Sequence, residues 1–324
     1  MALQARPKPT DTSGFEDKGM SITPLWTIMD KMVPPRPNPQ AANTVWRYDE
    51  MRPKLLEAAE VVSAEEAERR VLILVNKAMR APFTTDTIYA GLQIVCQGET
   101  APAHRHRAFA LRFIIEGSGG FTAVEGERMD MVPGDVILTP SWTWHDHGND
   151  GKEPVVWLDG LDLPLWQFLP INFMQLYKEP RFPSSPAPKS ALRFPWSQAQ
   201  AKLDSDSAKH SVTHYHRHDA KHLSDTISSQ AEKIVPGFTT APSKEVVSFV
   251  YHVYEGQGFT TIVSPRTGVS EKISWKTKDT FAVPGFSEVS HTCTSREQNA
   301  YLFAISDRPM IERLTCASLD ISME

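Results

Sequence analysis

The chain has 324 residues, of which 40% are hydrophobic and 23% charged, as in ordinary globular proteins. Its formal net charge of −5 provides no basic surface, so neither nucleic acid nor a membrane is an expected partner. The N-terminal sequence MALQARPKPTDTSGFEDKG lacks the apolar segment of a secretory signal. The three cysteines show no metal-type spacing, and we therefore expect reduced thiols in a cytoplasmic protein.

Residues 1–80 are predicted to form an N-terminal arm followed by a helical segment. Within it, Ser63 and Glu66 have the spacing of a capping box, which marks the start of a helix. The run VLILV that follows at 71–75 is short and apolar, and this favours a strand.

From residue 81 to 178 the sequence changes to short strand-like runs separated by turn residues, such as TIYAGLQIVCQGE and ALRFIIEGSGGFTAV. Several short strands at regular spacing are typical of an all-β barrel or sandwich. A Pro/Ser-rich stretch then indicates a linker over 179–230. Residues 231–324 repeat the β pattern, because FIIEGSGGFTAV is echoed by YHVYEGQGFTTIV at 251–263. The chain is therefore predicted to be mainly β, with one β unit duplicated.

Histidines gather in two tracts of the first β unit, ETAPAHRH and PSWTWHDHGN. His104 and His106 are two positions apart, so on a strand they share a face and can bind one ion. His145 would supply a third ligand from a strand that is distant in sequence. Three imidazoles leave open positions on the ion, which suits a non-haem Fe(II) oxygenase. Zn²⁺ with three histidines and a water would instead support hydrolysis or hydration, and the spacing leaves both metals open.

The spacing around these histidines resembles the two cupin motifs, G-x5-H-x-H-x3,4-E-x6-G and G-x5-P-x-G-x2-H-x3-N. The matching residues are Gly98, His104, His106, Gly134, Pro140, His145 and Asn149. Trp142 stands where the second motif has glycine. The glutamate ligand of the first motif would fall at Ala110 or Leu111. The resemblance with these departures implies a neutral site of three histidines.

A longer run, residues 90–165, resembles the gentisate 1,2-dioxygenase family, which includes salicylate and 1-hydroxy-2-naphthoate dioxygenases. The tracts SWTWHDHG and VVWLDGLD carry most of the resemblance, and SITPLW and WRYDEMRP extend it to about residues 21–180. Members of the family are bicupin enzymes, with two double-stranded β-helix (jelly-roll) barrels and one Fe(II) per subunit. The resemblance implies ring cleavage of an aromatic hydroxy acid by O₂, foremost of gentisate to maleylpyruvate. Salicylate and 1-hydroxy-2-naphthoate remain alternatives, and the family implies a homo-oligomer, either a dimer or a tetramer.

Further site residues follow from strand parity and from the resemblance. Arg112 has the same parity as the histidine ligands, so we expect it to point inward and bind the substrate carboxylate. His147 and Asp159 match polar positions of the family and could form a proton relay. Pocket-lining positions are Gln93, Trp157, Tyr89 and Gly91, the last of which would leave room for an aromatic ring. Candidates for a second cationic contact are Arg69, Arg70 and Arg80.

The second β unit lacks these ligands. Alignment on its hairpin places Pro242 and Lys244 opposite His104 and His106, and alignment on the prolines places Val289 opposite His145 and His291 opposite His147. We therefore expect a degenerate second barrel without a metal triad. The histidine-rich run THYHRHDAKHL at 213–223 is expected to be structural or solvated.

Two other classes of function remain open at this point. A metal-dependent isomerase or hydrolase on the same fold would consume no O₂. A non-catalytic cupin with a binding or sensory role would hold no iron.

Overall fold

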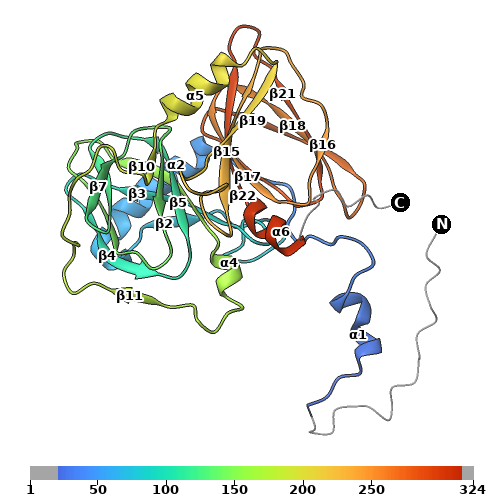
Figure 1. The fold of residues 1–324 in the computed structure, drawn as a ribbon, viewed down its shortest axis with the longest axis horizontal. Helices are drawn as coiled ribbons and strands as arrows, with labels where there is room; N and C mark the ends of the chain where they lie inside the picture. Colours follow the sequence, from blue (N-terminus) through green and yellow to red (C-terminus); the bar gives the residue numbers. More distant parts are fainter. Residues whose placement is uncertain (1–20, 316–324) are drawn as a thin grey trace. The chain divides into compact units, whose positions relative to one another are not determined.

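The computed structural model describes residues 21–315 of the chain (Figure 1). The chain divides into two units, residues 1–38 and residues 39–324. The described part of the first unit contains the helix α1 (Leu25–Met32), which buries none of its side chains. The second unit contains both β barrels.

The first barrel consists of two six-stranded sheets, with the strand orders β13-β8-β5-β10-β3-β2 and β11-β4-β9-β6-β7-β12 (Figure 1). The strands are β2 (Val71–Ile73), β3 (Tyr89–Val95), β4 (Thr100–His106), β5 (Ala110–Glu116), β6 (Gly120–Val124), β7 (Glu127–Asp130), β8 (Val136–Thr139), β9 (His145–Asn149), β10 (Val155–Leu161), β11 (Met174–Leu176), β12 (Ser185–Pro186) and β13 (Arg193–Phe194). Side chains from both sheets meet in one core, which includes Ile114 and Trp157 from the first sheet and Val124 and Met129 from the second. The sequence therefore folds into the predicted jelly roll.

The second barrel repeats this plan with the strand orders β1-β20-β17-β22-β15-β14 and β16-β21-β18-β19. Its strands are β1 (Thr44–Trp46), β14 (His210–His214), β15 (Ser228–Ile234), β16 (Ser243–Lys244), β17 (Phe249–Glu255), β18 (Gln257–Val263), β19 (Ser270–Lys276), β20 (Thr280–Val283), β21 (Glu288–Cys293) and β22 (Ala300–Ser306). Its core joins Ile234 and Tyr251 of the larger sheet to Ile262 and Trp275 of the smaller one. The predicted bicupin architecture is confirmed.

Short helices flank the barrels. They are α2 (Tyr48–Val61), α3 (Ala64–Ala67), α4 (Leu163–Trp166), α5 (Trp196–Ser205) and α6 (Arg308–Thr315). The predicted capping box opens α3, because the amide of Glu66 donates to Ser63 Oγ at 3.1 Å and the amide of Ser63 donates to Glu66 Oε2 at 3.2 Å. The predicted strand follows as β2. Among residues 21–315, no helix is long and apolar enough to cross a membrane.

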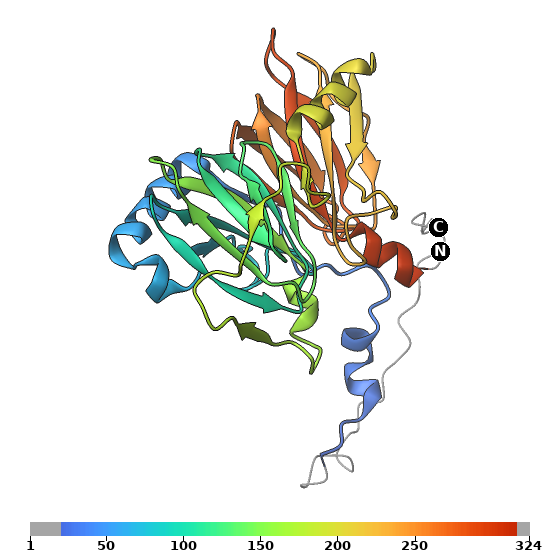
Figure 2. The ribbon, with the colours of Figure 1, turned by 60° about the vertical axis from the view of Figure 1, so that its left-hand side comes forward.

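The sheet of the first barrel that contains β5 packs against the six-stranded sheet of the second barrel (Figure 2). Phe113 of β5 stacks on Phe303 of β22, with 4.3 Å between ring centroids. Residues alternate between the two faces of a strand, so Phe113 faces the neighbouring barrel while Arg112 faces the inside of its own barrel. The contact between the barrels therefore buries the outer face of the β5 sheet in the first barrel and that of the β22 sheet in the second.

Segments outside the two predicted β units complete the sheets. The stretch 179–230, predicted as a linker, carries β12 and β13, which extend the first barrel, and β14, which extends the second. The strand β1 precedes the first barrel in sequence but pairs with β20 of the second. The predicted domain limits at residues 81, 178 and 231 remain our proposal for the two barrels.

Candidate active site

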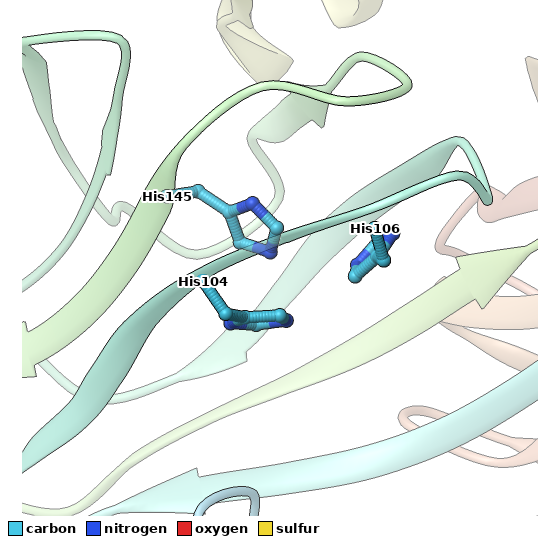
Figure 3. Close-up of side chains that lie close together, drawn as sticks. All are labelled: His104, His106 and His145. Carbon is cyan, nitrogen blue, oxygen red and sulfur yellow. The ribbon is translucent and has the colours of Figure 1, made fainter. Parts of the chain in front are cut away.

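The three predicted metal ligands lie together inside the first barrel. His104 and His106 project from β4, and His145 is the first residue of β9. These strands are antiparallel, with His104 directly opposite His145. One nitrogen from each ring lies within 4.8 Å of the others, and Figure 3 shows the three rings facing one another. Among residues 21–315 this is the one group with metal-binding geometry, and it contains no carboxylate.

The hydrogen bonds of two of the three rings, those of His106 and His145, leave Nε2 free. Nδ1 of His106 lies 2.8 Å from the Ala108 carbonyl, and Nδ1 of His145 lies 2.9 Å from the Thr143 carbonyl. Nδ1 of His104 lies 3.4 Å from the Pro102 carbonyl and is also contacted by Nη2 of Arg69, which can only donate. An imidazole that donates from Nδ1 to a carbonyl carries its lone pair on Nε2, which is the arrangement of a metal-ligating histidine. The residues therefore fit a metal ion held by one nitrogen from each ring, which for His106 and His145 is Nε2.

Burial keeps these imidazoles neutral. It lowers the pKa of His104 to about 2 and that of His106 to about 4, and it holds the pKa of His145 well below its usual value. The positive charge of Arg112 lowers all three pKa values further, and that of Arg69 lowers the pKa values of His104 and His106. A neutral imidazole has the free lone pair that a metal requires, so the site is ready to coordinate an ion at neutral pH.

Other polar side chains point into the same interior from the sheet that contains β3, β5 and β10. Cross-strand pairing places Trp157 beside Gln93, and Asp159 between Gly91 and Arg112. Several of their buried polar atoms have no hydrogen-bond partner in the protein: Gln93 Nε2, Arg112 Nε, His145 Nε2, His147 Nε2, Trp157 Nε1 and Asp159 Oδ1. Unpaired polar atoms are costly in a barrel core, and their concentration around the histidines indicates a site for a polar ligand.

Arg112 is fully buried, as the strand parity predicted. Its Nε and Asp159 Oδ1, which make no hydrogen bond of good geometry, face each other as an ion pair at 3.3 Å, and its Nη1 donates to Thr139 Oγ1. Burial raises the pKa of Asp159, and the neighbouring guanidinium opposes this rise. The carboxylate and the threonine together hold the guanidinium in place on the inner face of β5.

The predicted relay between His147 and Asp159 is not formed as a direct hydrogen bond. His147 Nδ1 lies 3.0 Å from Thr122 Oγ1, while Asp159 is paired with Arg112. The two residues lie on different sheets, and Asp159 has a cationic neighbour on the adjacent strand. His147 Nε2 still has no hydrogen-bond partner inside the barrel.

Of the three arginines considered for a second cationic contact, Arg69 is the one that reaches the histidines. Its Nη2 donates to the Pro102 carbonyl at 2.7 Å and contacts the ring of His104. Arg70 instead donates to Glu99 Oε1 at 2.9 Å, and Arg80 is exposed. Arg69 lies two residues before Val71, which pairs with Gln93 and packs against Gly91, and it therefore has the same parity as Val71.

Gly91 is closely surrounded. A Cβ atom there would lie 2.6 Å from Val71 Cγ1 and 2.9 Å from the hydroxyl oxygen of Tyr89. The space that the missing side chain provides is therefore bordered by Tyr89, whose buried hydroxyl has a raised pKa. Tyr89 and Gly91 share the inner face of β3 with Gln93.

The second barrel has a different interior at the corresponding positions. Val289 of β21 pairs with Ser243, one residue beyond the predicted Pro242. His291 Nδ1 lies 2.8 Å from Thr260 Oγ1, a pair that repeats Thr122 and His147.

The predicted structural role of the histidine-rich run is consistent with His222, whose Nε2 lies 2.9 Å from Glu312 Oε2 of α6.

Two jelly-roll barrels, one of which holds a buried group of three neutral histidines, define a bicupin with a candidate metal centre. The family described as Cupin domain matches residues 91–161. A gentisate 1,2-dioxygenase of Aquipseudomonas alcaligenes is 32% identical over 90% of this chain and 91% of its own length. A 5-aminosalicylate 1,2-dioxygenase of Comamonas is 31% identical over 91% and 85%, respectively. The crystal structure of a salicylate 1,2-dioxygenase from Pseudoaminobacter salicylatoxidans as an adduct with gentisate is similar, with a TM-score of 0.84, 26% identity and coverage of 98% and 96%.

The chain belongs to the gentisate 1,2-dioxygenase family of ring-cleaving enzymes. The predicted family resemblance is thereby confirmed.

Proposed function

We propose that the protein is an Fe(II)-dependent ring-cleaving dioxygenase that converts gentisate and O₂ to maleylpyruvate. The observation that carries this proposal is the pairing of three neutral histidines with two guanidinium groups, Arg69 and Arg112, inside one barrel. Neutral ligands leave the full charge of a divalent ion for an anionic substrate, and the guanidinium groups add to the positive potential. The gentisate adduct of the similar salicylate dioxygenase supports gentisate as the substrate.

The three histidines would hold Fe(II) and leave up to three coordination positions open. The bound ion would supply a site where an ortho-hydroxylated carboxylate and O₂ bind side by side and exchange electrons. The absence of a carboxylate ligand among the described residues makes the site more electrophilic than a site of two histidines and one carboxylate.

Arg112 would bind the substrate carboxylate and fix the plane of the ring. A guanidinium forms forked, charge-assisted bonds to carboxylates, and Arg112 already faces one carboxylate, that of Asp159, on the inner face of β5. Arg69 would neutralise the second negative charge of a doubly ionised substrate, because it lies beside the metal ligand His104. The ion pair with Asp159 would hold the Arg112 guanidinium away from the metal ion.

The remaining polar residues would handle protons and hydrogen bonds of the substrate. His147 Nε2 is buried and unpaired, so it could hold a proton at a ring hydroxyl or remove it. Gln93 and Trp157 present unpaired N–H donors that could bind substrate oxygens. Tyr89 and Gly91 would border the ring and influence which substituents fit.

The experiment that tests this function starts from metal-free protein loaded with Fe(II) under anaerobic conditions. Oxygen uptake is then measured with gentisate, salicylate and 1-hydroxy-2-naphthoate, and the ring-opened product is identified. We expect one O₂ per gentisate, formation of maleylpyruvate, and loss of turnover in His104→Ala. If the protein turns over salicylate or 1-hydroxy-2-naphthoate but not gentisate, the proposed substrate is wrong. If none of the three compounds causes oxygen uptake, the proposed dioxygenase activity is wrong.

We also propose one Fe(II) per subunit, a homo-oligomer of two or four chains, and a cytoplasmic location. The support is the single three-histidine group of the described residues and the family to which the chain belongs. Metal analysis, light scattering and cell fractionation test the three statements separately.

A further inference from the structure

The outer face of the strands that carry the histidines holds a stack of guanidinium groups and aromatic rings. Arg105 Cζ lies 4.5 Å from the ring centroid of Trp142 and 4.5 Å from that of Trp144. Arg107 Cζ lies 4.5 Å from the ring of Trp142 and 5.2 Å from that of Phe173. We call these five residues the cation–π stack. Contacts of this kind contribute about 0.5–1 kcal/mol each when exposed, and more when they are partly buried.

The cation–π stack joins the two segments from which the metal ligands project. Arg105 lies between His104 and His106 on β4 and points to the opposite face. Trp144 directly precedes His145, and Trp142 belongs to the turn before it. The amide of Trp142 also donates to the His106 carbonyl at 2.8 Å. Every stacked contact between Arg105 and the tryptophans therefore fixes β4 against the start of β9.

The backbone of Trp142 shows that the turn is held under strain. Its φ is +64°, a left-handed conformation that is unfavourable for a bulky side chain. The cupin motif has glycine at this position, which would adopt the same φ without cost. The ring of Trp142 is nevertheless in contact with Arg105, Arg107 and Phe173, so packing in the stack offsets the backbone strain.

We propose that the cation–π stack positions the metal ligands. It sets the separation of β4 from the turn at 140–143, so that His145 meets His104 and His106 at the distance one ion requires. The stacked residues act through the histidines and do not contact the substrate. This inference rests on the proposed metal site, and its test separates the two.

The test compares Arg105→Ala with a matched control, Arg128→Ala. Arg128 Cζ lies 3.9 Å from the ring centroid of Phe121 on the same sheet, but on β6 and β7, which carry no ligand. Metal-free proteins are titrated with Co(II), whose absorption reports the coordination geometry, and their melting temperatures are measured. We expect similar melting temperatures for the two variants, whereas Arg105→Ala alone binds Co(II) roughly tenfold or more weakly. Arg105→Lys, which keeps the charge but loses the planar group, should lie between wild type and Arg105→Ala.

Trp142→Gly separates positioning from stability. Glycine removes the backbone strain together with the ring packing that offsets it, so the melting temperature of the metal-free protein should change little, while the Co(II) affinity falls. Wild-type Co(II) affinity in both Arg105→Ala and Trp142→Gly would overturn the role of the stack. If the wild type binds no Co(II), or if His104→Ala binds it as well as the wild type does, the metal site itself is wrong and this inference fails with it.

Discussion

The charges inside the first barrel depend on a row of residues across three strands. Arg112, Asp159 and Gly91 are adjacent on β5, β10 and β3. Asp159 compensates the charge of Arg112 in the free protein, because an unpaired buried guanidinium would be costly. A substrate carboxylate brought to Arg112 would face repulsion from Asp159. A second guanidinium, that of Arg69, lies beside the histidines and would offset this repulsion in the proposed function.

Arg112→Lys should weaken substrate binding without emptying the metal site. Lysine keeps the charge but provides a point donor in place of a planar fork, and charged hydrogen bonds contribute about 1.5–3 kcal/mol. We expect the KM for gentisate to rise roughly tenfold to a hundredfold while the bound iron stays at wild-type content. Steady-state kinetics with metal analysis measure both, and the exposed Arg80→Lys is the control. An unchanged KM would show that Arg112 does not bind the substrate.

At the scale of single strands, alternation predicted most of the site. The spacing of His104 and His106 placed both on one face, and the same parity placed Arg112 inside. Parity could not choose between Arg69 and Arg70, because the choice depends on how β2 pairs with β3. The partner of Asp159 also could not be read from the sequence, since it is set by the register of β5 against β10.

Gly91→Ala tests how tightly β2 and β3 pack. The new methyl group would lie 2.6 Å from Val71 Cγ1, so one of the two strands must shift. Overpacking of this kind costs about 1–3 kcal/mol of unfolding free energy. The double variant with Val71→Ala should recover part of this loss, because it removes the closer of the two contacts. Urea unfolding measures both variants, and a Gly91→Ala protein as stable as the wild type would contradict the packing.

Asp162 connects β10 to α4 and to the chain that enters the second barrel. Its Oδ1 accepts from the Phe109 amide and Trp166 Nε1, each at 2.9 Å, and its Oδ2 accepts from Thr226 Oγ1 at 2.6 Å. Burial raises the pKa of this carboxyl from 3.8 to about 6. Between these two values the folded protein keeps a proton that the unfolded chain has released.

The contribution of Asp162 to stability should therefore fall as the pH rises from about 4 to about 6. The slope approaches about 1.4 kcal/mol per pH unit, and the total loss is roughly 3 kcal/mol. Asp162→Asn has no such proton, so the unfolding free energy of the wild type should decline relative to this variant across that range. Urea titrations at several pH values measure the difference, which would be independent of pH if the Asp162 pKa were normal.

At the scale of the whole molecule, the two barrels behave as one packed body within the described residues. The echo of FIIEGSGGFTAV in the second half predicted the duplication, and the resemblance predicted the bicupin fold. The stacking of Phe113 on Phe303 has no signal in either repeat alone, because a strand with both faces buried reads as a uniform apolar run. The pairing of β1 with β20 was missed for a related reason, since three residues contain too little pattern to name a distant partner.

Phe303→Ala should destabilise both barrels together. Removal of a fully buried phenylalanine costs about 3–5 kcal/mol, and the lost contact with Phe113 lies between the barrels. We expect one cooperative unfolding transition at a lower temperature, in which Co(II) absorption at the metal site and a spectroscopic label in the second barrel change together. The exposed Val269→Ala should leave the transition unchanged. Two separate transitions in the wild type would show that the barrels fold independently.

The position of β1 has a consequence for how the chain is made. Residues 44–46 leave the ribosome long before β20, and the amide of Tyr48 bonds to Asp279 across 231 positions of sequence. Residues 231–324 alone therefore do not complete the second barrel. Its six-stranded sheet gains the edge strand β1 only after β20 has been synthesised. In a nascent chain whose first barrel has already folded, β1 still lacks its partner, and the native fold is reached only when β1 pairs with β20.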